Sequence, residues 1–178
     1  MARLERIVDE LASRYEAPWF MPHVSLHVDR VVEQADLPAV VDETAARFAP
    51  FAMRAGPTDH SPAIFKTLFV TMSGGDIFEL AAALETGVAR WRPAPTEAAE
   101  PLRVFRLEPH LSLLYKELPD HERAKLADRY CYDGESFRFD RIATVTPGPG
   151  ARDFSRVDDW LVSPARVLVG VGRQPCTG

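Results

Sequence analysis

Apolar residues recur every three or four positions in the first stretch of the chain, residues 3–15. Leu4, Val8 and Leu11 belong to this row, and charged residues such as Asp9 lie between them. Such spacing places the apolar side chains on one face of a helix and the charged ones on the other. The pattern therefore predicts that the chain opens with an amphipathic helix.

Three further helices are predicted over residues 36–48, 76–91 and about 120–130. Asp36 precedes the first of them and can cap it with its carboxylate. Asp76 is followed three residues later by Glu79, which is the spacing of a capping box at the start of a helix.

The segments between these helices have the character of strands. In residues 23–28, His, Ser and His alternate with Val, Leu and Val, and a period of two is typical of a strand with one polar face. Strands are also predicted over residues 51–54, 64–72, 109–115, 137–145 and 167–171. Strands and helices thus alternate in two similar halves, without the Gly-rich first turn of a doubly wound nucleotide fold. The sequence predicts an α+β fold.

The length and composition suit one compact unit. A chain of 178 residues, 46% of them hydrophobic, can bury the core of one domain, so we expect residues 1–178 to form a single two-lobed domain. Residues 92–101 contain three prolines and no large apolar side chain, which predicts a mobile loop there.

Charge and cysteine content limit the partners. The formal net charge of −5 lacks the basic field with which proteins bind long nucleic acids, whereas a small nucleotide or a short RNA end remains compatible. The two cysteines, Cys131 and Cys176, have no CxxC partner, no stretch is long enough to span a membrane, and no apolar signal core opens the chain. We expect a cytoplasmic monomer.

The most informative feature is an internal repeat. Residues 22–26 read Pro-His-Val-Ser-Leu, and residues 109–113 read Pro-His-Leu-Ser-Leu. Because side chains alternate across a strand, His23 and Ser25 should share one face while their apolar neighbours face the core. Each half of the protein is therefore predicted to present an imidazole together with a hydroxyl.

His110 and Ser112 form the same pair in the second half. Imidazole titrates near pH 6.5, so one histidine can accept a proton from water while the other, protonated, donates to a leaving oxygen. The hydroxyls of Ser25 and Ser112 can donate hydrogen bonds to phosphate oxygens. His23 and His110 are the candidate catalytic residues for opening a cyclic phosphate.

Simpler interpretations exist for each of these residues. A lone histidine is more often structural, and strand serines often bond to the backbone, but the repeated context favours catalysis here. His27 would stand about 13 Å from His23 on a strand, which excludes a shared metal, so no metal site is predicted, and we expect His27 to be solvated at the rim.

The two H-x-S motifs, each followed by leucine, resemble those of the two-histidine (2H) phosphoesterase superfamily. The similarity is to its cyclic phosphodiesterase branch. Residues 20–26 and 109–115 resemble the two motif strands of that branch, and a Glu-Leu dipeptide follows the second at 117–118. Weaker similarity covers residues 64–72 and 136–141 as well as the first helix.

The resemblance implies a bilobal fold with two antiparallel sheets around a central cleft and helices outside. It also implies metal-independent, cofactor-free hydrolysis of a nucleoside 2',3'-cyclic phosphate or ADP-ribose 1'',2''-cyclic phosphate to a phosphomonoester. His23 and His110 would be the catalytic pair, and Ser25 and Ser112 would hold the phosphate. An enzyme that processes RNA ends, like a 2'-5' RNA ligase, and a non-catalytic nucleotide-binding module are the alternatives.

Two aromatic residues are further candidates for binding the substrate. The resemblance makes Tyr115 a contact in the active site, although in an ideal strand it points away from His110, so this role requires a bulge or twist. Phe65 lies in a segment that resembles the strand lining the cleft, where it could stack on a base or pack in the core. Members of the branch also carry a strand before the first helix, and residues 167–171 are a candidate to replace it.

Overall fold

The computed structural model of the protein describes residues 2–28, 31–32, 34–93, 105–148 and 157–170. In this part of the chain the helices and strands follow one another in the order α1 (Ala2–Tyr15), α2 (Leu37–Arg47), β1 (Phe51–His60), η1 (Ile64–Lys66), β2 (Leu68–Ser73), α3 (Ile77–Ala89), β3 (His110–Leu114), α4 (Asp120–Arg129), β4 (Ser136–Phe139), β5 (Arg141–Ile142), β6 (Val145–Thr146), η2 (Val157–Asp159), β7 (Leu161–Val162) and β8 (Arg166–Val167), where η marks a 3-10 helix.

All four helices predicted from the apolar spacing are present, α1 to α4. Asp36 caps α2 as expected, because its Oδ1 accepts a hydrogen bond of 3.0 Å from the Ala39 amide. Asp76 occupies the corresponding position before α3, but its side chain makes no capping hydrogen bond. The proposed capping box at α3 is therefore wrong, and the turn there depends on Gly75, whose φ of +67° suits glycine.

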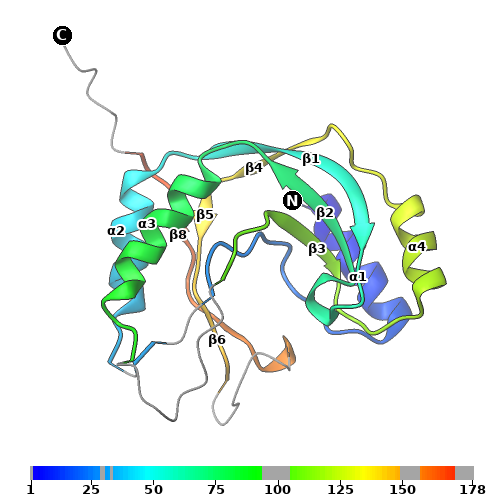
Figure 1. Ribbon diagram of the computed structural model, residues 1–178, viewed down its shortest axis with the longest axis horizontal. Helices are drawn as coiled ribbons and strands as arrows, with labels where there is room; N and C mark the ends of the chain where they lie inside the picture. The colour runs from blue at the N-terminus through cyan, green and yellow to red at the C-terminus, as the bar shows by residue number, and fades with distance from the viewer. Residues whose placement is uncertain (1, 29–30, 33, 94–104, 149–156, 171–178) are drawn as a thin grey trace.

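The main sheet is antiparallel and has the strand order β3-β2-β1-β4. It curls, and α1 and α4 lie at the same side of the molecule, close to its strands (Figure 1). The core between these helices and the sheet is apolar and buried, and consists of Leu4, Leu11, Met53, Ala55, Leu68, Val70, Met72, Ile77, Leu111, Leu113, Leu114, Leu126, Tyr130 and Tyr132.

A second lobe is built on α2 and α3, which lie side by side at the opposite side of Figure 1. Its core consists of Val40, Val41, Ala45, Leu80, Leu84, Val88, Ile142 and Leu168. Strands β5 and β8 pair beside it, and β6 pairs with β7. The amides of Val169 and Gly170 donate to the carbonyls of Ala45 and Phe48, which satisfies acceptors that the end of α2 leaves open.

Strand β3 contains a bulge that decides where Tyr115 points. The rung after the one at Ser112 uses Leu114, so Leu113 is an extra residue without a partner of its own. Both leucines are buried in the main core. Tyr115 consequently turns to the face that carries His110, where its ring stacks on that of Phe20. The bulge that a site role of Tyr115 requires is therefore present.

The strand predicted over residues 23–28 is wrong, because this segment has no ladder partner among the described residues. Its alternating pattern has another cause. Val24 packs against the main core, and Leu26 packs against both the main core and the core of the second lobe. Burial does not follow the alternation throughout, since Val28 is 50% exposed while the His27 side chain is only 13% exposed. The segment therefore lies between two cores and is not a strand of a sheet.

Three other strand predictions differ in detail. Residues 64–66 form the 3-10 turn η1, which Thr67 closes by donating its hydroxyl to the Ile64 carbonyl at 3.0 Å. Residues 137–145 are split among β4, β5 and β6, because the chain leaves β1 and pairs next with β8. The last strand is only β8, and its pairing with β5 places it in the second lobe. Most of the loop predicted over 92–101 lies outside the described residues.

The α+β class and the 2H-like architecture are confirmed: in the described residues α1 and α4 pack on a curled antiparallel sheet, and α2 and α3 pack together beside it. The second sheet expected from the resemblance consists of two separate ladders of two strands each, β5 with β8 and β6 with β7. None of the helices in the described ranges has the length and apolar character needed to cross a membrane.

Replacing Leu111 by alanine should lower the free energy of unfolding by about 2–5 kcal/mol, because the change leaves a cavity beneath β3 where Leu111 is only 1% exposed. The measurement is equilibrium denaturation in urea. Leu161→Ala is the matched control, since Leu161 is 53% exposed and the change should cost less than about 0.5 kcal/mol. Equal losses in the two variants would contradict this assignment of the core.

Candidate active site

His23 lies on the segment between α1 and α2, where the flanking residues fix its ring. Its Nδ1 is 2.6 Å from the carbonyl oxygen of Met21. The ring edges of Phe20 and Trp160 approach the imidazole, with centroids 6.1 Å and 6.5 Å away. Because Val24 packs into the main core directly after it, His23 is tied to the sheet although its segment is not a strand.

His110 is the first residue of β3 and has the same local arrangement. Its Nδ1 is 2.6 Å from the carbonyl oxygen of Glu108, again two residues earlier in the chain. Thr71 is its partner on β2, and the ring of Phe69 meets the imidazole edge-on at 5.5 Å. Both motif histidines are therefore held by the same type of hydrogen bond, from Nδ1 to the carbonyl two residues earlier.

This shared hydrogen bond assigns the tautomer of both rings. A backbone carbonyl only accepts, so Nδ1 of His23 and of His110 must carry the proton that is donated. In the neutral form Nε2 is then the basic nitrogen of each ring. The repeat thus prepares two imidazoles to exchange protons through the same atom.

Burial affects the protonation of both motif histidines. Desolvation lowers the pKa of His23 below 6.5, and the hydrogen bond to Met21 opposes this only in part. Desolvation is also the main cause that lowers the pKa of His110, and the charge of His23 adds to the effect. Because protonating one ring disfavours the proton on the other, the pair holds fewer protons at neutral pH than two free histidines would.

The two motif serines are placed differently. Ser25 is exposed. Ser112 is only 3% exposed, and its hydroxyl donates to the carbonyl of Phe65 at 3.0 Å. In this structure Ser112 therefore links β3 to η1, and its hydroxyl would have to rotate to reach a bound phosphate.

Aromatic rings form a cluster beside His23. Tyr115 stacks on Phe20 with centroids 3.9 Å apart and meets Phe65 edge-on at 5.4 Å. Trp160 lies 5.9 Å from the Phe65 ring and 6.1 Å from that of Tyr115. Burial raises the pKa of Tyr115 to about 12, so its phenol keeps its proton at physiological pH.

Sequence reasoning predicted Tyr115 and Phe65 as contacts but missed Trp160. This residue follows η2 and directly precedes β7, whose pairing with β6 holds it in place. Its neighbours in sequence belong to no repeated motif, so only the folded chain brings it to His23. The structure thus adds one ring to the predicted set.

His27 does not lie free in solvent as expected. Its side chain is 13% exposed, and Nδ1 is 3.1 Å from the carboxylate of Glu85 on α3. Arg92 binds the other oxygen of the same carboxylate at 2.6 Å. His27 thus helps to join the first motif segment to α3. In the described part of the chain, no group of three or more His, Cys, Asp or Glu side chains is arranged to hold a metal ion.

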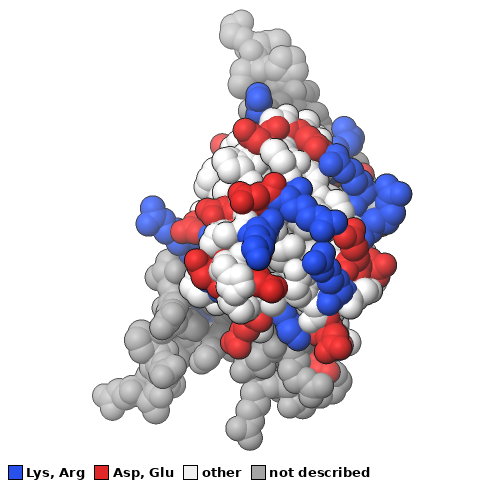
Figure 2. Space-filling view, turned by 90° about the vertical axis from the view of Figure 1, so that its right-hand side faces the viewer, with Lys and Arg blue, Asp and Glu red and all other residues white. Residues whose placement is uncertain are grey.

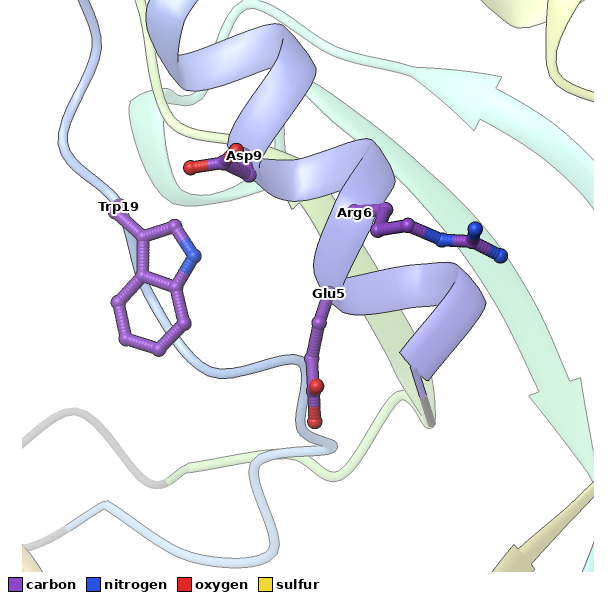
Figure 3. Close-up of a pocket in the computed structure, with 4 residues that line it drawn as sticks. All are labelled: Glu5, Arg6, Asp9 and Trp19. Atoms are coloured by element: carbon purple, nitrogen blue, oxygen red, sulfur yellow. The ribbon is translucent and has the colours of Figure 1, made fainter.

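A shallow hollow beside α1 has neither motif histidine among its lining residues (Figure 3). Glu5, Arg6 and Asp9 line it from the helix, and Trp19 lines it from the segment that follows. Trp19 is 49% exposed, whereas its neighbour Phe20 is buried at 5%. The ring of Trp19 therefore points outward, whereas the ring of Phe20 packs inside the protein beside His23.

Comparison with known proteins agrees with this picture. The family model described as the 2'-5' RNA ligase superfamily matches residues 2–148, so the chain belongs to this superfamily. The resemblance to 2H phosphoesterases is thereby confirmed at the level of the superfamily, and the family leaves the cyclic phosphodiesterase branch undecided.

A crystal structure of the protein TT0787 from Thermus thermophilus has a similar fold. It is 14% identical in sequence and superimposes with a TM-score of 0.58, over 97% of this chain and 95% of that chain. At this level of identity the likeness concerns the fold alone. No curated protein matches the sequence significantly.

The lowered pKa of His23 predicts a stability that depends on pH. Below pH 6.5 the unfolded chain binds a proton that folded His23 resists, so the free energy of unfolding should fall as the pH drops from 6.5 toward 5. His23→Asn should weaken this dependence in denaturation measured at several pH values. His121→Asn, at an exposed position of α4, should keep the dependence of the wild type. Identical slopes in all three proteins would contradict the prediction.

Proposed function

We propose that the protein hydrolyses a cyclic phosphodiester, such as a nucleoside 2',3'-cyclic phosphate or ADP-ribose 1'',2''-cyclic phosphate, to a phosphomonoester. The observation that carries the proposal is the matched pair of histidines, His23 and His110, each oriented by a backbone carbonyl and each with a pKa lowered by burial. Membership in a superfamily of enzymes supports a catalytic role over a merely binding one.

The reaction needs two proton transfers and no metal. The neutral histidine takes a proton from water through Nε2 while the water oxygen attacks phosphorus in line. The bond from phosphorus to one ribose oxygen breaks, and the protonated histidine gives its proton to that oxygen. One proton is taken up and one released, so the pair ends with its charge unchanged and its two roles exchanged.

The surroundings of the pair suit the rest of such a substrate. Ser25 and Ser112 remain the predicted donors to the phosphate, and Tyr115 remains a predicted contact because its ring belongs to the aromatic cluster beside His23 and its phenol keeps its proton. Phe65 and Trp160 offer aromatic surface next to His23, which favours a substrate with a planar organic part. We expect a small nucleotide as the partner.

A second candidate is an RNA end, which the description of the matching superfamily favours. Binding beyond the reacting group would require phosphate contacts, and these need clustered positive charge. The face over α1 and α4 instead interleaves Lys and Arg with Asp and Glu (Figure 2), as in the pairs of Arg3 with Glu135 and of Arg129 with Glu10. With the net charge of −5, this favours the small substrate.

We expect hydrolysis of the cyclic phosphates to proceed in EDTA and to fall at least about 100-fold in His23→Ala and in His110→Ala, since each variant lacks one proton-transfer group. The measurement is steady-state kinetics on a panel of 2',3'-cyclic nucleotides, ADP-ribose cyclic phosphate and short RNA ends. His121→Ala is the matched control and should retain activity. Loss of activity in EDTA, or full activity in either motif variant, would sink the mechanism, and activity on RNA ends alone would favour the second candidate.

The pH dependence of kcat/KM should be a bell whose maximum lies below pH 6.5. Activity needs one neutral and one protonated histidine, and the pKa values of both lie below 6.5 in the free protein because of desolvation. Both limbs should be read from initial rates between pH 4.5 and 9 in overlapping buffers. A maximum above pH 7.5 would show that the pair titrates otherwise.

A further inference from the structure

Lys66 stands on the same face of the sheet as His110. It is the last residue of η1, next to Phe65, and its ammonium lies 4.7 Å from the centre of the Phe69 ring. Phe69 pairs with Ser112 across β2 and β3 and meets His110 edge-on. The turn η1 thus sends Phe65 toward the aromatic cluster and Lys66 toward the second motif.

The partner of Lys66 is the side chain of Glu108, at 2.7 Å from Nζ to Oε2. Glu108 thus acts twice, because its backbone carbonyl orients His110 while its carboxylate holds Lys66. The two side chains are 66% and 27% exposed, for Glu108 and Lys66 respectively. Such a pair is weakly held in water, so the ammonium can pass to another anion at little cost.

A positive charge at Lys66 would supply what the other site residues do not offer a phosphate. The hydroxyl of Ser112 is donated to the Phe65 carbonyl, and desolvation favours the neutral form of both histidines. A phosphate carries charge on its non-bridging oxygens, and this charge grows as water attacks. The ammonium of a lysine, a point charge on a flexible side chain, can bind these oxygens and stabilise that charge.

We propose that Lys66 is a further catalytic residue, whose ammonium exchanges the Glu108 carboxylate for a non-bridging oxygen of the phosphate. This inference rests on the proposed hydrolysis for its kinetic consequence, and on phosphate binding alone for its structural one. Lys66 also affects the protonation of His110. Its positive charge lowers the pKa of His110, as His23 does, whereas Glu108 raises it.

Lys66→Met should lower kcat/KM for a 2',3'-cyclic nucleotide by about 10-fold to 100-fold, the scale of one hydrogen bond to a charged group. Lys66→Arg should recover part of the loss. The deciding variant is Glu108→Gln, which keeps the backbone carbonyl for His110 but releases Lys66, and should lower KM by about 1.5-fold to 5-fold. Lys125→Met, at an exposed position of α4, is the control for removing a positive charge.

A merely structural ion pair would behave differently, because Lys66→Met and Glu108→Gln would then damage the enzyme alike, and that result would overturn the proposal. In Lys66→Met the limb of the pH profile that belongs to His110 should also move to higher pH, which loss of structure would not produce.

Binding of adenosine 2'-monophosphate, measured by calorimetry, tests Lys66 without turnover. We expect about 10-fold weaker binding to Lys66→Met and unchanged binding to Lys125→Met. If the wild type hydrolyses no cyclic phosphate while this difference in binding remains, the proposed hydrolysis is wrong and the Lys66 site stands. If Lys66→Met binds the nucleotide as the wild type does, the Lys66 proposal is wrong whatever the activity.

Discussion

One hydrogen bond, made twice, underlies the site: Nδ1 of a histidine to the carbonyl two residues earlier. The residue between them is proline in both copies, Pro22 and Pro109. Proline fixes its own φ and pushes the residue before it toward an extended conformation, so carbonyl and imidazole meet without any distant partner. The same local geometry therefore forms in an irregular segment at His23 and in a strand at His110. Three consecutive residues thus fix the orientation of each imidazole, and the fold only has to bring the two copies together.

Burial then decides the charge of the pair. Because desolvation lowers the pKa of both rings, the free protein keeps them largely neutral at neutral pH, when a general acid would need its proton. An anion placed between them acts in the opposite direction, since a nearby negative charge favours the protonated ring. The proposed substrate would in this way supply the protonation state that its own hydrolysis needs. Lys66 lowers the pKa of His110, so it limits how far a bound anion can raise that pKa.

The reach of the sequence differs from one feature to another. Helices follow from local spacing, and α1 was predicted to begin within one residue of its observed start. The motif histidines were identifiable because their context is contiguous and repeated. The strand at residues 23–28 was mispredicted because apolar residues in alternation need not pair in a ladder: Val24 and Leu26 pack against the cores without one, and Val28 is exposed. Trp160 carries no local signal, since what makes it part of the site is its contact with a ring at the far end of the chain.

The bulge in β3 shows how a break in a local rule serves the site. Strict alternation would bury Tyr115 beneath the sheet with Leu111 and Leu113. The extra residue reverses the parity after Ser112, so that the strand keeps its leucines in the main core and still turns Tyr115 toward Phe20 and Phe65. Strand β3 and the residue that follows it thereby contribute His110, Ser112 and Tyr115 to one face within six residues. The aromatic cluster that results joins α1, η1 and the segment after η2, so the packing that supports His23 depends on a bulge beside His110.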